Sequence, residues 1–252
     1  MRKLRLILLG GATIIASPAS AQYNYMPPTY YSNPVNLMLE QRSIQIGLDN
    51  ANPSQPQDDR NGLEVPRNEA IDTHYTPIKE RTQQNLAAYA AKSRISNSVD
   101  ADAMERLFAN VDVVGMARQI QQRIGLQNDD VVDAYTFWLV VTWEAANPDP
   151  SRVFSAEKFG IAASPAAINS AREQTRTAVQ RLSGIATATD AEKQNFSESL
   201  LIQGLLIQIQ SLHAGSDKAH REVIAQLALS QGKAAGTDFS AVTLTEQGFA
   251  PR

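Results

Sequence analysis

The chain has 252 residues, with 23 lysines and arginines, 26 aspartates and glutamates, and no cysteine. Disulfide bonds and a cysteine-linked lipid anchor are therefore excluded. Without the three basic residues of its first 21 positions, 20 basic side chains remain against 26 acidic ones, a net charge of −6. This balance argues against nucleic acid and anionic lipid headgroups as partners, because both select for clustered lysine and arginine.

The first 21 residues have the three parts of a secretory signal peptide. Three basic side chains precede a mostly apolar run over residues 6–15, which is too short to span a bilayer. The small-residue motif Ala19-Ser20-Ala21 follows it. We therefore predict cleavage before Gln22, export to the periplasm or beyond, and no membrane span in the mature chain. An uncleaved N-terminal anchor is the alternative.

Residues 22–77 are predicted to form a disordered linker. They contain seven prolines, many asparagines and glutamines, and few aliphatic side chains, so ordering them would bury little apolar surface. One stretch within them, residues 35–48, is apolar enough to dock on the domain that follows. The tyrosines and prolines of residues 23–31 suggest a recognition segment, and a low-complexity spacer is the alternative.

Residues 78–252 are predicted to form an all-α domain, a compact bundle of about six or seven helices. Cap residues followed by apolar side chains three and four positions apart support this fold class. The tail over residues 238–252 is apolar enough to pack back onto the bundle. The expected helices cover residues 78–93, 131–146 and 190–213, begin at Asp102, Asp112 and Asp217, and extend from Ser164 to Gly184.

Two of these helices are predicted to form the core. Residues 131–146 are apolar on nearly all sides, which is typical of a helix surrounded by others. Residues 190–213 follow a complete capping-box motif, Thr189 to Glu192. Gly204 lies in the middle of the second helix, where glycine is less stable than alanine by about 1 kcal/mol. A close crossing with another helix would explain it.

The sequence contains few residues with catalytic or metal-binding potential. His213 and His220 lie on either side of a break at Gly215, and we interpret them as surface groups rather than metal ligands. The chain has no nucleophile-elbow motif and no glycine-rich phosphate loop. We therefore predict neither a metal nor a cofactor.

The best candidates for ligand binding or acid–base chemistry are Asp133, Trp143 and Glu144 on the central helix. A carboxylate among aromatic side chains can have a raised pKa. The two acids are eleven residues apart, which is roughly 16 Å along a helix and too far for a glycosidase pair. Capping and solvent-facing roles are the alternative for the acids. Trp143, with Trp138 and Tyr135, is either a platform for sugars or peptides or part of the core.

A series of short motifs carries a resemblance to a family of uncharacterised exported α-helical proteins of Gram-negative bacteria. The resemblance implies a helical domain in the periplasm or outside the cell, and it supplies no activity, cofactor or catalytic residue. It extends from about residue 78 to residue 249. The motifs are Asn85-Leu86-Ala87, Leu107-Phe108, Gly125-Leu126, Asp133-Ala134-Tyr135 with Trp138 and Trp143, Thr189 to Gln194, and Leu244 to Phe249.

The functional prediction is an exported, non-enzymatic binding or assembly protein of the bacterial envelope, with an envelope protein as its partner. The alternative is an unrecognised hydrolase of cell-wall or secreted polymer that uses Glu144 or Asp133 in a groove lined by Trp143. A concave pocket that exposes one of these acids beside a second acid would favour the hydrolase. Buried tryptophans and lone surface acids would argue against it.

Overall fold

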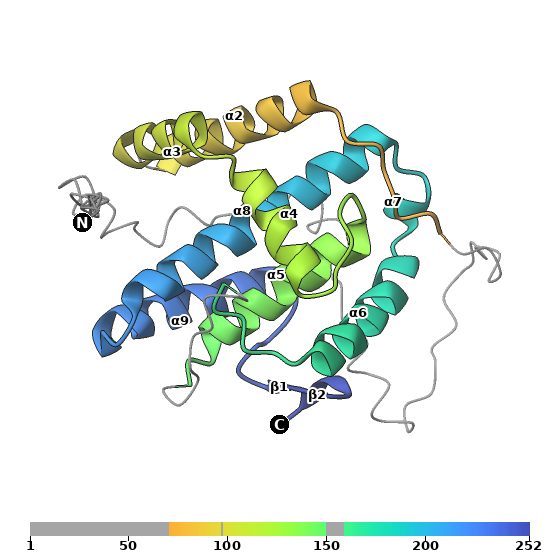
Figure 1. Cartoon of the computed structure of the whole chain (residues 1–252), viewed down its shortest axis with the longest axis vertical. Helices are drawn as coiled ribbons and strands as arrows, with labels where there is room; N and C mark the ends of the chain where they lie inside the picture. The colour runs from red at the N-terminus through yellow and green to blue at the C-terminus, as the bar shows by residue number, and fades with distance from the viewer. Residues whose placement is uncertain (1–70, 97, 150–158) are drawn as a thin grey trace, which may run out of the picture.

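The computed structural model describes residues 71–96, 98–149 and 159–252. The predicted signal peptide and most of the predicted linker, residues 1–70, lie outside this part of the chain. The described residues form eight α-helices and a two-stranded sheet (Figure 1). The predicted all-α class is confirmed. None of the described helices is both long enough and apolar enough to cross a membrane.

The helices follow one another from residue 79 to residue 234, and the strands come last. α7 is a single turn that the sequence analysis did not separate from the helix before it. The elements are α2 (Lys79–Ser96), α3 (Ser98–Asn110), α4 (Val113–Arg123), α5 (Val131–Ala146), α6 (Pro165–Gln180), α7 (Ser183–Ala186), α8 (Asp190–Ala214), α9 (Lys218–Ala234), β1 (Val242–Thr245) and β2 (Gly248–Pro251).

α5 is the central helix of the domain. It packs against α8, α9 and α6, and every residue in it except Glu144 is buried. This burial follows from a sequence that is apolar on all sides. α8 crosses α5 closely at Gly204, where an added Cβ atom would lie 2.8 Å from the Phe137 ring. The predicted close crossing is confirmed, and a larger side chain at this position would push the two helices apart.

The predicted helix caps are present at five helix starts and one helix end. Asp112 and Asp217 accept hydrogen bonds from backbone N–H groups in the first turns of α4 and α9. Asp130, Ser164 and Thr189 accept hydrogen bonds from backbone N–H groups in the first turns of α5, α6 and α8. The capping box at Thr189 is complete. Gly125 follows α4 with a φ angle of 84°, which favours glycine and ends this helix. Each of these caps is formed by residues that are close together in the sequence.

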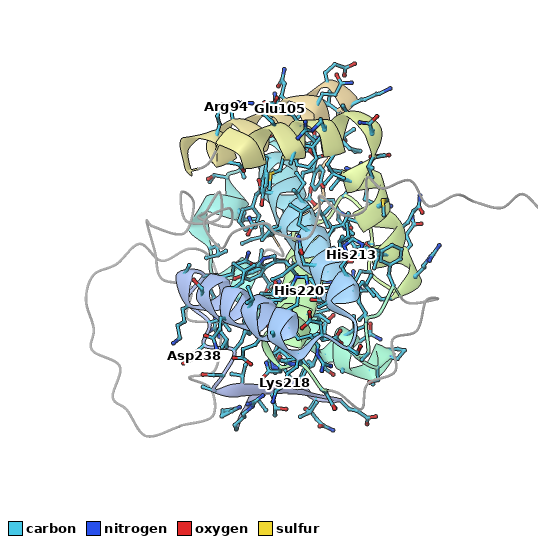
Figure 2. All side chains as sticks on the ribbon, turned by 90° about the vertical axis from the view of Figure 1, so that its left-hand side faces the viewer. Arg94, Glu105, His213, Lys218, His220 and Asp238 are labelled. Atoms are coloured by element: carbon cyan, nitrogen blue, oxygen red, sulfur yellow. The ribbon has the colours of Figure 1, made fainter. Side chains whose placement is uncertain are left out.

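Two predicted helix boundaries are wrong. α3 begins at Ser98 rather than at Asp102, because Asp102 and Glu105 serve a different purpose from capping. Both carboxylates pair with Arg94 of α2, at 2.8 and 2.7 Å, and Figure 2 shows Arg94 and Glu105 side by side on the α2–α3 pair. α6 ends at Gln180, before the predicted Gly184, because the chain turns there into α7.

The tail packs back onto the bundle as predicted, but it does so as a β-hairpin that the sequence analysis missed. β1 and β2 are antiparallel, with Leu244 opposite Phe249. The side-chain amide of Gln174 on α6 accepts from the Phe249 N–H at 2.8 Å and donates to its carbonyl at 3.0 Å. The Gln174 side chain therefore makes the two backbone hydrogen bonds that a third strand would make, and it attaches the outer edge of β2 to α6.

Candidate functional site

Residues 71–78, the N-terminal strap, lie along the start of α5. The backbone N–H of Val131 donates to the Thr73 carbonyl at 3.0 Å, and that of Tyr75 donates to the Asp129 carbonyl at 3.0 Å. The Thr73 hydroxyl also donates to the buried cap carboxylate of Asp130 at 2.7 Å. The strap is thus paired with the chain that leads into α5.

The strap is also bound to the start of α8. The N–H of Thr76 donates to the Asp190 carboxylate at 3.0 Å, and the Lys193 ammonium donates to a strap carbonyl. The Gln194 side chain pairs with both the N–H and the carbonyl of Ile78, at 3.0 and 2.9 Å. The described chain therefore enters the domain at a fixed place, where the N-terminal ends of α5 and α8 meet.

Asp133, one of the three predicted site residues, lies in the first turn of α5. Its carboxylate is buried, accepts from the Gln127 N–H at 2.6 Å and forms an ion pair with Arg172 of α6. Burial raises the pKa of Asp133, and these two partners oppose the increase. Its contacts join α6 and the α4–α5 connection to α5. The structure does not bring Asp133 close to Glu144, which lies at the other end of the helix.

A second buried carboxylate, Glu198 of α8, was not among the predicted site residues. Its side chain is fully buried, and its carboxylate interacts with four donor groups. The Thr82 hydroxyl lies at 2.6 Å, the Asn85 amide at 2.7 Å, the Gln194 amide at 3.0 Å and the Arg118 guanidinium at 3.3 Å. Glu198 thus joins α2, α4 and α8. Its one sequence signal is a charge two residues before the apolar run of a core helix that begins at Leu200.

Arg118 extends this polar cluster towards the strap. Its guanidinium lies 2.9 Å from the Asp129 carboxylate as well as close to Glu198. Tyr75 of the strap is 6% exposed, and burial raises the pKa of its phenol to about 12, against the opposing effect of the Arg118 charge. The cluster is therefore a set of packed, mutually bonded groups between the strap and three helices.

The raised pKa of Tyr75 predicts a loss of stability at high pH. An unfolded tyrosine ionises near about pH 10, whereas folded Tyr75 keeps its proton to about 12. Between these values the unfolded chain binds fewer protons than the folded chain, so the free energy of unfolding falls as pH rises. In Tyr75→Phe we expect a shallower fall, measured by urea unfolding at several pH values. Tyr30→Phe, in the predicted linker, should keep the wild-type slope; equal slopes for all three proteins would contradict the prediction.

Trp143, the second predicted site residue, lies near the end of α5 and is 5% exposed. Its indole N–H donates to the Val242 carbonyl of β1 at 3.1 Å, and its ring meets that of Phe249 edge-on. Trp138 and Tyr135 are also buried, at 1% and 0% exposure. The core-packing interpretation is confirmed for these two rings, and Trp143 joins the hairpin to the central helix.

Glu144, the third predicted site residue, is the part of α5 that reaches the surface. Its carboxylate accepts from the backbone N–H groups of Ala162 at 3.0 Å and Ala163 at 2.7 Å. These contacts fix the segment that leads into α6. A charged side chain at the end of the core helix therefore orders a connection, and it also borders the concave surface described next.

A concavity of about 270 Å³ lies against β1, and we call it the β1 hollow. Glu144 and Glu246 both border it. A smaller pocket of about 50 Å³ also borders Glu144, together with Arg221 and Gln208. The β1 hollow is lined by Trp143, Glu144, Ala162, Ala163, Ser164, Ala167, Leu244, Thr245 and Glu246.

Backbone groups of β1 are available beside this hollow. Phe249 directs its N–H and carbonyl to Gln174, away from β1, so the Leu244–Phe249 pair is one that makes no hydrogen bonds between the strands. Leu244 therefore directs its own N–H and carbonyl away from β2, as Val242 directs its carbonyl to Trp143. Within the described residues, neither backbone group of Leu244 has a hydrogen-bond partner.

No group of three or more histidine, aspartate or glutamate side chains in the described ranges is arranged to hold a metal ion. His213 is exposed at the end of α8, and His220 lies in the first turn of α9 (Figure 2). A comparison with protein-family models, curated proteins and solved structures finds no match. The resemblance to exported helical proteins therefore stays a prediction.

Proposed function

We propose that this chain is an exported binding or assembly protein of the bacterial envelope, whose helical domain receives an extended segment of a partner protein beside β1. The observation that carries the proposal is the pair of unpartnered backbone groups of Leu244 at the β1 hollow. An extended chain placed there as an added strand would bond to both groups. This is a common way for proteins to recognise peptides.

The charge of the β1 hollow indicates the chemistry of the partner segment. Glu246 is exposed at the rim of the hollow, and Glu144 borders the same hollow. A segment with lysine or arginine side chains is therefore favoured over an acidic one. Backbone pairing supplies affinity for any extended chain, and the two acids add a preference among chains.

Export is supported by the N-terminal sequence. The basic start, the short apolar run and the Ala19-Ser20-Ala21 motif together are typical of a cleaved signal peptide. A chain without cysteine also needs no oxidative step to fold after export. The proposed place of action is the periplasm or the space outside the cell.

Photo-crosslinking in cells tests the proposed function. A photoreactive amino acid at Thr245 should give an adduct with a lysine- or arginine-bearing segment of an envelope protein, identified by mass spectrometry. Leu244→Pro should abolish this adduct, because proline removes the outward N–H and is tolerated at a strand edge. Leu244→Val keeps the N–H and should retain it.

Three outcomes would contradict the proposal. The first is an adduct that forms equally in Leu244→Pro. The second is the same set of adducts from a photoreactive group at Val223, an exposed position on α9. The third is an adduct within the chain itself and none with another protein. Circular dichroism of Leu244→Pro shows whether the domain has kept its helical fold.

One observation favours the hydrolase as a second candidate function. Glu144 and Glu246 border the same hollow, which is the arrangement of a second acid near Glu144 that the hydrolase needs. Against it, both oxygens of Glu144 already accept backbone hydrogen bonds, and both tryptophans are buried. Release of soluble fragments from purified cell wall by the mature protein, lost in Glu246→Gln, would support hydrolysis. No release would rule it out for this polymer.

A further inference from the structure

We propose that the partner segment received beside β1 is the C-terminal end of its chain, and that Arg221 of α9 binds its terminal carboxylate. This inference rests on the proposed function, because the segment uses the same edge of β1. It adds the chemical class of the partner, which is a free chain end and not an internal stretch. The smaller pocket beside Glu144, its guanidinium and the point where the edge of β1 becomes occupied each support it.

The smaller pocket, which we call the Arg221 pocket, has groups that suit a carboxylate. Its lining includes Arg221 and Ile224 of α9, Gln208 and Ser211 of α8, and Glu144 of α5. Among the residues that the structure describes, none forms a hydrogen bond or an ion pair with the half-buried Arg221 guanidinium. The pocket measures about 50 Å³, and one water molecule needs roughly 10–15 Å³. It therefore holds a group of a few heavy atoms, such as a carboxylate.

The charges of the Arg221 pocket favour a ligand with a single negative charge. Arginine binds a carboxylate through two parallel N–H donors, which makes it the preferred partner of this group. Glu144 and Asp149 also border the pocket. The Glu144 carboxylate is directed to the backbone N–H groups of Ala162 and Ala163, and Asp149 is exposed. Two acids near the guanidinium disfavour a ligand of higher negative charge, such as a phosphate.

The Arg221 pocket adjoins the β1 hollow. Glu144 belongs to both linings, and Gly160 and Ala162, two positions apart in the chain, belong to one each. An extended chain advances about 3.3 Å per residue, so two or three residues beyond its pairing with Leu244 would carry it past Glu144. A segment that starts at the edge of β1 can therefore end beside Arg221.

The edge of β1 favours a chain that leaves it after Leu244. The carbonyl of Val242, the next outward-facing group towards the start of β1, accepts from the Trp143 indole at 3.1 Å. An added strand thus loses this pairing site and turns towards the end of α5, where Glu144 lies. A strand antiparallel to β1 would pass Leu244 before Val242, so the end that reaches α5 is its C-terminal end.

Binding of two synthetic peptides to the mature protein tests the inference. Both are chains of five alternating valines and lysines with a neutral fluorophore at the N-terminus; one ends in a carboxylate and the other in an amide. We expect the carboxylate peptide to bind about tenfold more tightly in fluorescence anisotropy, because the amide lacks the charge that Arg221 attracts. Arg221→Gln should bind both peptides equally. Lys218→Gln, which removes an exposed cation from the same helix, should keep the preference.

A third peptide separates a chain end from an acidic side chain. It ends in an aspartate with an amidated C-terminus and should bind no more tightly than the amide peptide. Binding as tight as that of the carboxylate peptide would overturn the inference, because any carboxylate would then serve. Three other results would also overturn it: equal binding of the first two peptides to the wild type, a preference that survives Arg221→Gln, and binding of neither peptide.

Leu244→Pro distinguishes a failure of this inference from a failure of the proposed function. It removes the outward N–H of β1, so it should weaken both peptides by a similar factor. If it does so while the wild type binds both peptides equally, the edge of β1 receives the segment and the carboxylate site is wrong. If Leu244→Pro changes nothing while Arg221→Gln removes the preference, the carboxylate site is confirmed and the strand addition is wrong. Circular dichroism of each variant shows whether the helical fold is retained.

Discussion

Glu198→Ala should destabilise the protein by about 3–5 kcal/mol, which is the usual cost of removing one member of a buried charged pair. The carboxylate is fully buried and accepts hydrogen bonds from Thr82, Asn85 and Gln194 besides its contact with Arg118. Alanine would leave these donors without their acceptor inside the protein. The expected result is a large fall in the urea concentration at the unfolding midpoint, followed by circular dichroism.

Two comparisons separate this effect from a general loss of charge. Glu222→Ala removes an exposed carboxylate from α9 and should change the stability by no more than about 0.5 kcal/mol. Glu198→Gln keeps one acceptor oxygen but places an amide N–H₂ group towards donors, so its effect should lie between the two. Matching midpoints for Glu198→Ala and Glu222→Ala would show that the buried cluster does not stabilise the fold.

The location of the damage is a second expected result of Glu198→Ala. Thr82 and Asn85 are both on α2, and α2 meets α8 along this contact. Amide hydrogen exchange in α2 should therefore accelerate more than exchange in α9, which supplies none of the donors to Glu198 described above. Uniform acceleration over both helices would indicate that Glu198 supports the whole core and not the attachment of α2.

The parts of the fold that the sequence predicts are those that depend on neighbouring residues. The caps at Asp130, Ser164 and Thr189 each need a side chain and the first turn of its own helix. The burial of α5 follows from the composition of sixteen consecutive residues. Gly204 indicated a close crossing because its cost in a helix needs a compensating contact.

The parts that the sequence does not predict depend on residues far apart in the chain. Glu198 bonds to Asn85, 113 residues away, and a single sequence gives no sign of that pairing. The hairpin was missed because β1 and β2 are only four residues each, and Gln174 of α6 occupies the outer edge of β2. Leu244 became a candidate only when its pairing with Phe249 showed which way its backbone groups point.

The residues of the candidate site also divide into those that the sequence predicts and those that only the folded chain brings together. Trp143 and Glu144 were predicted from their place on an apolar helix, and they border the β1 hollow. Asp133 was predicted by the same reasoning and lies elsewhere, because eleven residues of helix separate it from Glu144. Glu246, the second acid of the hollow, comes from the hairpin turn. Only the folded chain brings that turn to the end of α5.

Trp143→Ala should destabilise the protein by about 3–5 kcal/mol, which is typical of removing a buried large aromatic ring. The ring is 5% exposed, packs edge-on against Phe249, and donates its N–H to Val242. Its loss would leave a cavity between α5 and the hairpin and free one attachment of β1. The measurement is again the urea midpoint, with hydrogen exchange of β1 and β2 as a local readout.

Trp143→Phe distinguishes packing from ligand binding at this position. Phenylalanine keeps most of the ring packing but lacks the N–H, so the loss should be only about 1–2 kcal/mol, and β1 should exchange faster than α9. A structural residue gives this graded order: wild type, then Phe, then Ala. If Trp143→Ala instead kept the wild-type midpoint and lost only the crosslinks from Thr245, the tryptophan would be a surface for the partner. The burial of the ring and its bond to β1 favour the graded order.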